Sequence, residues 1–108
     1  MTTAYKVLGQ LNPAATTATT LYTVPSSTSA VCSTLSICNV GVATTFRVAV
    51  RPAGATLDPK HYIVYDAALN QYDSVLLTLG ISLATTDVVT VYAGHANLAF
   101  SLFGAELT

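Results

Sequence analysis

The stretch TTFRVAVR, residues 44–51, alternates apolar side chains with others at every second position. In a β-strand, neighbouring residues point to opposite faces of the sheet. One face of this strand is therefore predicted to carry Phe46, Val48 and Val50. The other face is predicted to carry Thr45, Arg47, Ala49 and Arg51. Such a pattern is typical of a half-buried strand, which packs one face on a core and turns the other outward.

The rest of the chain has the same character, with short apolar or alternating runs rich in β-branched and aromatic residues. Besides residues 44–51, strands are predicted near residues 4–9, 19–24, 30–39, 60–66, 73–79, 88–94 and 97–104. The sequence therefore predicts an all-β protein, with residues 1–108 forming a single-domain antiparallel β-sandwich of about eight strands. A jelly roll and an immunoglobulin-like sandwich both fit this pattern. The Ala/Thr-rich segment NPAATTATT, residues 12–20, is expected as an extended arm or as a loop over the sandwich.

The composition is poor in charge. Charged residues make up 8% of the chain and the net charge is −1, whereas about a quarter of the residues are charged in an ordinary soluble domain. Because copies with so little charge repel each other weakly, we expect the protein to self-associate. Four Lys and Arg residues supply no basic field for a phosphate backbone, so nucleic-acid binding is not expected.

No apolar run approaches the roughly 20 residues that a membrane-spanning helix needs, so no membrane association is expected. The opening MTTAYKVLGQ has no basic start followed by an apolar segment, which argues against a secretory signal. We therefore expect synthesis in a reducing cytoplasm.

The two cysteines lie in AVCSTLSICN, residues 30–39. Strict alternation places Cys32 and Cys38 on the same face of one strand. They are six positions apart (38 − 32), which at about 3.3 Å per residue separates their Cα atoms by about 20 Å, too far for a disulfide. No second Cys/His pair completes a zinc site. We interpret both as small buried hydrophobic residues, with an intermolecular disulfide or a reactive thiol as open alternatives.

The other titratable residues form no catalytic motif, so no catalytic, cofactor-binding or metal-binding residues are predicted. His61 and His95 are interpreted as surface or interface residues. The carboxylates interpreted as turn-forming groups are Asp58, Asp66, Asp73 and Asp87. A calcium site among these carboxylates is the alternative.

Three residues are predicted as contacts with a partner: Arg47, Arg51 and Phe103. The two arginines share a strand face, where planar guanidinium groups could bind carboxylates of a neighbouring subunit, although two solvated arginines fit equally well. In the last predicted strand, alternating apolar residues define one face, and Phe103 falls on the opposite, less apolar face. This position suggests that a partner covers it. The tyrosines Tyr62, Tyr65 and Tyr92 could form a platform for sugars, but packing in the core or an interface is the favoured interpretation.

Several stretches, namely TTLYTVP, TTFRVAVRPAGATL, KHYIVYDAAL, LTLGISLATTDVVTVYA and NLAFSLFGAEL, are similar to those of a known group. From about Ala4 to the C-terminus, the chain resembles small virion structural proteins of tailed bacteriophages, including cyanophages. The most specific pieces are KHYIVYD and the ending DVVTVYA with FSLFG. Cys32 and Cys38 stand where an aliphatic strand is expected, which fits their interpretation as packing residues.

This resemblance implies a non-enzymatic role in the virion. The expected role is that of a capsid cement or decoration protein, which forms a homo-oligomer, with a homotrimer as the hypothesis, and binds the major capsid protein or another virion protein. Location in the virion, at the capsid surface, is expected. The alternative is a tail or fibre component, in which a β-sandwich could bind glycans. A small enzyme is the third class, and it is disfavoured because few acidic and basic residues are present to build a site.

Overall fold

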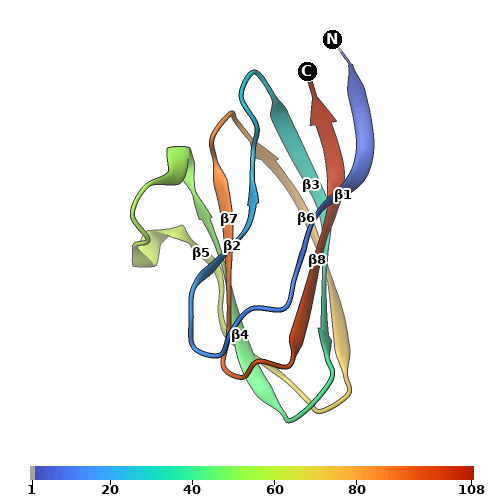
Figure 1. Ribbon diagram of the computed structural model, residues 1–108, viewed down its shortest axis with the longest axis vertical. Helices are drawn as coiled ribbons and strands as arrows, with labels where there is room; N and C mark the ends of the chain where they lie inside the picture. The colour runs from blue at the N-terminus through green and yellow to red at the C-terminus, as the bar shows by residue number, and fades with distance from the viewer. Residues whose placement is uncertain (1) are drawn as a thin grey trace.

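The computed structural model describes residues 2–108 and shows two four-stranded antiparallel sheets facing each other (Figure 1). In chain order, the strands are β1 (Thr3–Leu11), β2 (Thr19–Thr23), β3 (Ser29–Asn39), β4 (Thr44–Arg51), β5 (Tyr62–Leu69), β6 (Ser74–Leu83), β7 (Val88–Ala93) and β8 (Leu98–Leu107). Two short 3-10 helices, η1 (Pro52–Gly54) and η2 (Pro59–His61), lie in the connection between β4 and β5. The predicted antiparallel β-sandwich of eight strands is confirmed.

The order of the strands identifies a jelly roll. Strands from the two halves of the chain pair as β1 with β8, β2 with β7, β3 with β6 and β4 with β5. Additional pairing of β3 with β8 and of β4 with β7 gives sheet 1, in the order β1-β8-β3-β6, and sheet 2, in the order β2-β7-β4-β5. Two four-stranded sheets with this nested pairing are the jelly-roll arrangement. The immunoglobulin-like alternative is therefore wrong.

The hydrophobic core lies between the two sheets. Phe46 of sheet 2 and Phe100 of sheet 1 meet edge to face, with ring centroids 6.4 Å apart. Phe46 and Val48 are buried and Val50 is partly buried against them, as alternation along residues 44–51 predicts. Burying a large aromatic or aliphatic side chain contributes about 1.5–3 kcal/mol to folding, so this layer is the main source of stability.

A β-bulge in β3 changes the faces on which the cysteines lie. Cys32 pairs with Gly104 while Thr34 pairs with Phe103, so one extra residue, Ser33, is inserted on β3. Before the bulge Cys32 points into the core and is fully buried. After the bulge, Leu35 and every second residue that follows it point into the core. Cys38 lies on the other face of the strand and is only partly buried. The prediction of one shared face is wrong, because a bulge shifts the alternation by one residue.

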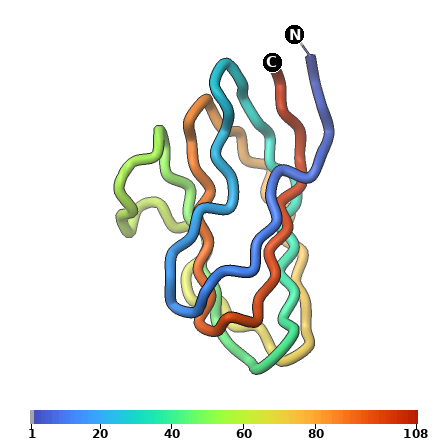
Figure 2. The backbone as a smooth tube through the Cα atoms, viewed as in Figure 1, coloured from blue at the N-terminus to red at the C-terminus, as the bar shows by residue number. Residues whose placement is uncertain are grey.

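The segment of residues 12–20 lies as a loop that leads into β2, far from the chain termini (Figure 2). The Asn12 Nδ2 donates a hydrogen bond to the Leu98 carbonyl at 2.6 Å, and the Thr16 amide donates to the Ala93 carbonyl at 2.8 Å. These bonds fasten the segment to the turn between β7 and β8. It is therefore a loop over the end of the sandwich and not a free arm.

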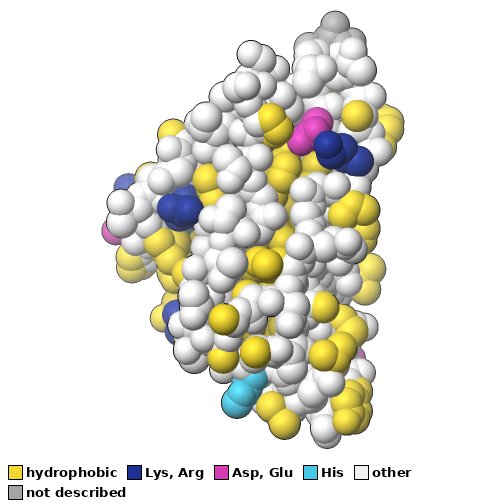
Figure 3. All heavy atoms as spheres, viewed as in Figure 1, with side chains coloured by type: hydrophobic (Ala, Val, Ile, Leu, Met, Phe, Trp, Pro, Cys, Tyr) yellow, Lys and Arg dark blue, Asp and Glu magenta, His cyan; other side chains and the backbone are white. Residues whose placement is uncertain are grey.

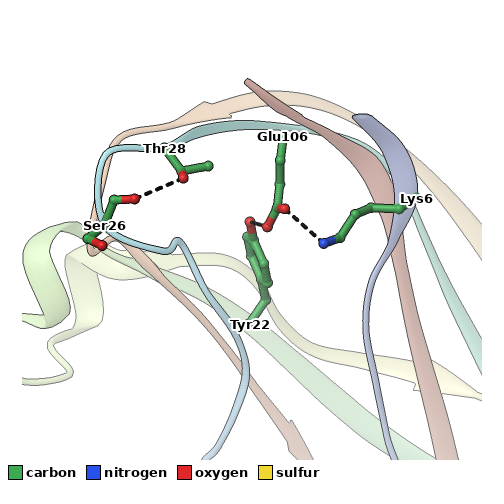
Figure 4. Close-up of polar contacts among 5 residues, drawn as sticks. All are labelled: Lys6, Tyr22, Ser26, Thr28 and Glu106. Carbon is green, nitrogen blue, oxygen red and sulfur yellow. Dashed lines mark hydrogen bonds and ion pairs between the residues drawn. The ribbon is translucent and has the colours of Figure 1, made fainter. Parts of the chain in front are cut away.

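A polar bridge joins the two sheets near the termini (Figure 4). The Tyr22 hydroxyl of β2 donates to the Glu106 carboxylate of β8 at 2.6 Å, and Lys6 of β1 forms an ion pair with the same carboxylate at 2.8 Å. The hydrogen bonds from Lys6 and Tyr22 lower the pKa of Glu106. Burial, followed by the bond to Glu106, raises the pKa of Tyr22. The bridge therefore holds a carboxylate anion and a neutral phenol at neutral pH.

Candidate functional site: two outer sheet faces

On the outer face of sheet 2, five residues form what we call the Arg47 cluster: Arg47, Tyr62, Tyr65, Asp66 and Tyr92. The Arg47 guanidinium donates to both Asp66 carboxylate oxygens, from Nε at 2.6 Å and from Nη2 at 3.3 Å. Its Cζ atom lies 4.3 Å from the ring centroids of both Tyr65 and Tyr92. Tyr62 meets Tyr65 edge to face at 4.9 Å. The hydrogen bond to Asp66 raises the pKa of Arg47, so the cation persists.

A β-bulge in β5 builds this cluster. Phe46 pairs with Ala67 and Val48 pairs with Val64, so two residues, Tyr65 and Asp66, stand opposite Arg47 alone. Asp66 has a φ of 50°, a conformation that Asp tolerates better than most side chains. Asp66 thus lies inside a strand, and its interpretation as a turn residue is wrong. The bulge brings an aromatic ring and a carboxylate to the same cation.

Arg51 and His61 secure the connection between β4 and β5. Arg51 donates from Nε to the Thr90 hydroxyl at 3.0 Å and from Nη1 to the Ala55 carbonyl at 3.0 Å. The buried His61 accepts a hydrogen bond at Nδ1 from the Asp58 amide, at 3.1 Å. The interpretation of His61 as a surface or interface residue is wrong, because its imidazole caps η2 from within. His95, by contrast, is exposed as predicted.

These contacts bear on the predicted arginine interface. The fork of donors on Arg47 that a neighbour's carboxylate would use is already bound to Asp66. Two donor nitrogens of Arg51 are likewise occupied within the chain. Subunit contact through Arg47 and Arg51 stays a prediction, and the structure gives both side chains an intramolecular role first.

The outer face of sheet 1 has a different character, because it carries an open apolar groove of about 820 Å³. The lining residues of this outer groove are Thr3, Tyr5, Lys6, Val7, Val31, Ser33, Phe103, Gly104, Ala105 and Leu107. Tyr5 is 86% exposed, Val7 46% and Val31 39%. Phe103 pairs with Val7 on one neighbouring strand and Thr34 on the other, which places it in the middle of the sheet. An exposed apolar surface on an otherwise packed domain marks an interaction site.

Phe103 was predicted as a contact residue, whereas its neighbours in the outer groove were not. Tyr5 and Val7 alternate along β1, and this pattern was available in the sequence. What the sequence lacked was the pairing of β1 with β8, which places Val7 beside Phe103. The exposure of Val31 could not be predicted either, because of the bulge that follows it. Strict alternation assigns Val31 to the same face as Leu35, which is buried.

Charges on this face are compensated. Lys6 lines the outer groove, but its ammonium group is paired with Glu106. Figure 3 shows few charged side chains on a surface that is mostly apolar or neutral, with an acidic group directly beside a basic one near the top of the view. The outer groove therefore favours a partner surface that is itself neutral and apolar.

The carboxylates Asp58, Asp73 and Asp87 serve the turns, as predicted. Asp58 caps η2 by accepting from the Lys60 amide, Asp73 accepts from the Ser74 amide, and Asp87 accepts from the amides of Ala53 and Ala84. In the described part of the chain, no three His, Cys, Asp or Glu side chains lie close enough together to hold a metal ion.

The two thiols should differ in reactivity. Burial raises the pKa of the Cys32 thiol to about 11, whereas Cys38 lies on the partly exposed side of β3. A thiol with a pKa raised by burial stays protonated and unreactive at pH 8, because the thiolate is the nucleophile. We expect the native protein at this pH to react with one equivalent of Ellman's reagent and the unfolded protein with two. Cys38→Ser should abolish the native reaction; a native signal that survives this change would contradict the assignment.

Comparison with known proteins leaves the family open: no protein-family model matches the chain, and no curated protein matches it. Within residues 2–108, no helix is long and apolar enough to cross a membrane.

Proposed function

We propose that this protein is a non-enzymatic structural subunit of a tailed-phage virion, in which it acts as a capsid cement or decoration protein. The observation that carries the proposal is the outer groove, an open apolar surface on sheet 1 to which the exposed Tyr5, Val7 and Val31 contribute together with Phe103. The sequence resemblance to phage virion proteins supplies the biological setting. Viral capsid domains also use jelly rolls, but so do lectins and cupins, so the fold alone decides nothing.

The occupant of the outer groove in this proposal is a second copy of the chain. The outer groove carries no unpaired charge, so it fits an equally neutral surface. Because the net charge of the chain is −1, electrostatic repulsion between copies is weak. A closed homotrimer satisfies each groove and prevents open-ended growth. The remaining surface of the trimer then binds the major capsid protein at the outside of the shell.

Stabilisation of the shell follows from mass action. A subunit that binds assembled capsomers, but not separated ones, lowers the free energy of the assembled state by an amount that grows with its concentration. No reaction chemistry is required of the protein. Its tasks are to fold in the host cytoplasm, to self-associate, and to recognise a repeated surface.

Phe103→Ser tests the self-association step. We expect this change to weaken self-association by about tenfold or more, because it removes the largest apolar side chain in the middle of the outer groove. The measurement is sedimentation equilibrium over a range of concentrations. Leu76→Ser is the matched control, since Leu76 is 66% exposed on β6 of the same sheet but lies outside the groove.

Two results would reject the oligomer: a wild-type protein that stays monomeric at every concentration, or equal loss of association in both variants. Attachment to the virion is tested separately, by co-sedimentation with purified capsids and by locating the subunit in a reconstruction of the intact particle. Density that bridges capsomers supports the cement role, and density confined to the tail rejects it.

A tail or fibre component is the second candidate. The observation that favours it lies on the opposite face of the sandwich, where Tyr65 is 59% exposed beside a pocket. An exposed aromatic ring of this kind suits ligand recognition at the periphery of a particle.

A further inference from the structure

We infer that the pocket between η2 and β5 is a binding subsite for a neutral saccharide unit. The inference concerns sheet 2 and is independent of the outer groove and of the cement role. It holds for a subunit on the shell or on the tail, and it can be tested on the isolated chain.

The pocket has the size and lining of a small-ligand site. It is an open hollow of about 580 Å³, lined by Leu57, Asp58, Pro59, Tyr62 and Tyr65. Small-molecule sites have volumes of roughly 300–1,000 Å³, with apolar and aromatic walls and a few placed polar groups. Here two aromatic rings, a proline and a leucine form the walls, and a carboxylate is the placed polar group.

The aromatic wall is held rigidly. Tyr65 is fixed by the Arg47 guanidinium, whose Cζ lies 4.3 Å from the ring centroid, and by Tyr62, whose ring meets it edge to face at 4.9 Å. Arg47 is itself fixed by both carboxylate oxygens of Asp66, whose φ of 50° belongs to the bulge. Bulges that re-aim side chains, and non-glycine residues held at positive φ, concentrate at functional sites. An exposed ring held in this way loses little conformational entropy when a ligand stacks on it.

The polar group of the pocket is also held in position. Asp58 is exposed, accepts the Lys60 amide at Oδ1 at 3.1 Å, and donates its own amide to His61 at 3.1 Å. An ionised carboxylate offers about four acceptor sites, so capacity remains for the hydroxyl groups of a ligand. The carboxylate thus provides acceptors beside an apolar, aromatic wall.

Charge selects a neutral ligand. Among the described residues that line the pocket, Asp58 alone is charged, and its carboxylate repels anions. The Asp58 carboxylate would attract a cation, but the Arg47 cation, 4.3 Å from the Tyr65 ring centroid, weakens the attraction of that ring for a second positive charge. A neutral pyranose matches what remains, since it offers an apolar C–H face to an aromatic ring and hydroxyl donors to a carboxylate.

The test is a titration of the ¹⁵N-labelled full chain, followed by amide chemical shifts. The probes are the methyl glycosides of glucose, galactose, mannose, N-acetylglucosamine, fucose and rhamnose, each taken to high millimolar concentration. The methyl glycoside of N-acetylneuraminic acid serves as the anionic probe and choline as the cationic one. We expect saturable shifts at residues 57–65 with at least one neutral glycoside, and none there with the sialic acid glycoside or choline.

Variants assign the effect to the pocket. Tyr65→Ala should weaken binding by about tenfold, while Tyr65→Phe, which keeps the ring, should retain it. Asp58→Asn keeps a capping side chain and should weaken binding several-fold. Tyr72→Asn is the control, because Tyr72 is 76% exposed outside the pocket and Asn tolerates its φ of 60°.

The inference is overturned by an absence of shifts at residues 57–65 with every neutral glycoside. It is equally overturned if only choline or the sialic acid glycoside binds there, or if Tyr65→Ala binds as tightly as the wild type. Because the spectrum also reports folding, a variant that unfolds is recognised at once, and Tyr65→Phe together with Asp58→Asn then carries the decision.

Discussion

Asn39→Asp should lower the free energy of unfolding by about 4 kcal/mol, although it changes one side-chain atom. Asn39 is 1% exposed at the end of β3. Its Nδ2 donates to the carbonyls of Val42, Leu69 and Asn70 at 2.8, 3.2 and 3.0 Å. Aspartate would replace Nδ2 by a second carboxylate oxygen, so that one oxygen of a buried anion would face three carbonyl acceptors without a donor.

The position of Asn39 explains why the loss should be global. Its Oδ1 accepts from the Gly41 amide at 2.9 Å and from the Asn97 Nδ2 at 3.1 Å. One side chain therefore ties together the β3–β4, β5–β6 and β7–β8 turns, which draw on both sheets. Breaking a buried polar network of this kind removes several bonds together.

The measurement for Asn39→Asp is urea unfolding followed by far-UV circular dichroism, because the chain contains no Trp for fluorescence. Asn70→Asp is the matched control. Asn70 is exposed and contributes its main-chain carbonyl to Asn39, so changing its side chain should alter stability by less than about 0.5 kcal/mol. Equal unfolding midpoints for the two variants would show that Asn39 has no such role.

Gly104→Ala should lower the free energy of unfolding by about 3 kcal/mol or more. Gly104 lies in β8, which is flanked by β1 and β3, and it stands opposite Cys32 beside the bulge. A Cβ atom there would collide with the Val31 carbonyl oxygen and lie 3.1 Å from the Cys32 Cα atom. Both obstacles are backbone atoms in the middle of sheet 1, so relief requires two strands to move apart.

Gly80→Ala separates this collision from the general cost of replacing glycine. Gly80 has a φ of 61°, but a Cβ atom there would meet nothing within 4 Å. The change should cost about 1 kcal/mol, which is the strain of a left-handed alanine. Urea unfolding of both variants gives the comparison directly. If Gly104→Ala proved no more harmful than Gly80→Ala, close packing of β3 against β8 at this point would be disproved.

Predictions that depended on local pattern succeeded, and those that assumed unbroken alternation did not. Every predicted strand overlaps an observed one, because apolar alternation and turn residues are read within a few positions. Cys38 was placed wrongly because of the bulge in β3, and Asp66 because β5 does not end at residue 66 but continues through a bulge to Leu69. A bulge is visible only when the partner strand is known, since it is a mismatch between two strands.

The functional residues divide in the same way. Phe103 could be found from its own strand, because it breaks the apolar set that alternates around it. The role of Arg47 could not, since it depends on Asp66, which the pairing of β4 with β5 places opposite it. The role of His61 was missed although its contact is local: its ring accepts from the amide of Asp58, three positions earlier, in the cap of η2. Asn39 gave no signal at all, because three of its polar partners, on Leu69, Asn70 and Asn97, come from segments distant in the sequence.

The sequence by itself determined that this protein is an all-β sandwich with few charged residues and with more apolar side chains than one core face of each strand accommodates. Only the tertiary structure decided that the sandwich is a jelly roll, that Tyr5, Val7, Val31 and Phe103 come together on the outer face of sheet 1, and that the arginines are held by the chain itself. The physical reason is the separation along the chain of the residues that set each feature. Alternation is a property of neighbouring residues, whereas strand order and bulges are set by pairing between segments as far apart as β1 and β8.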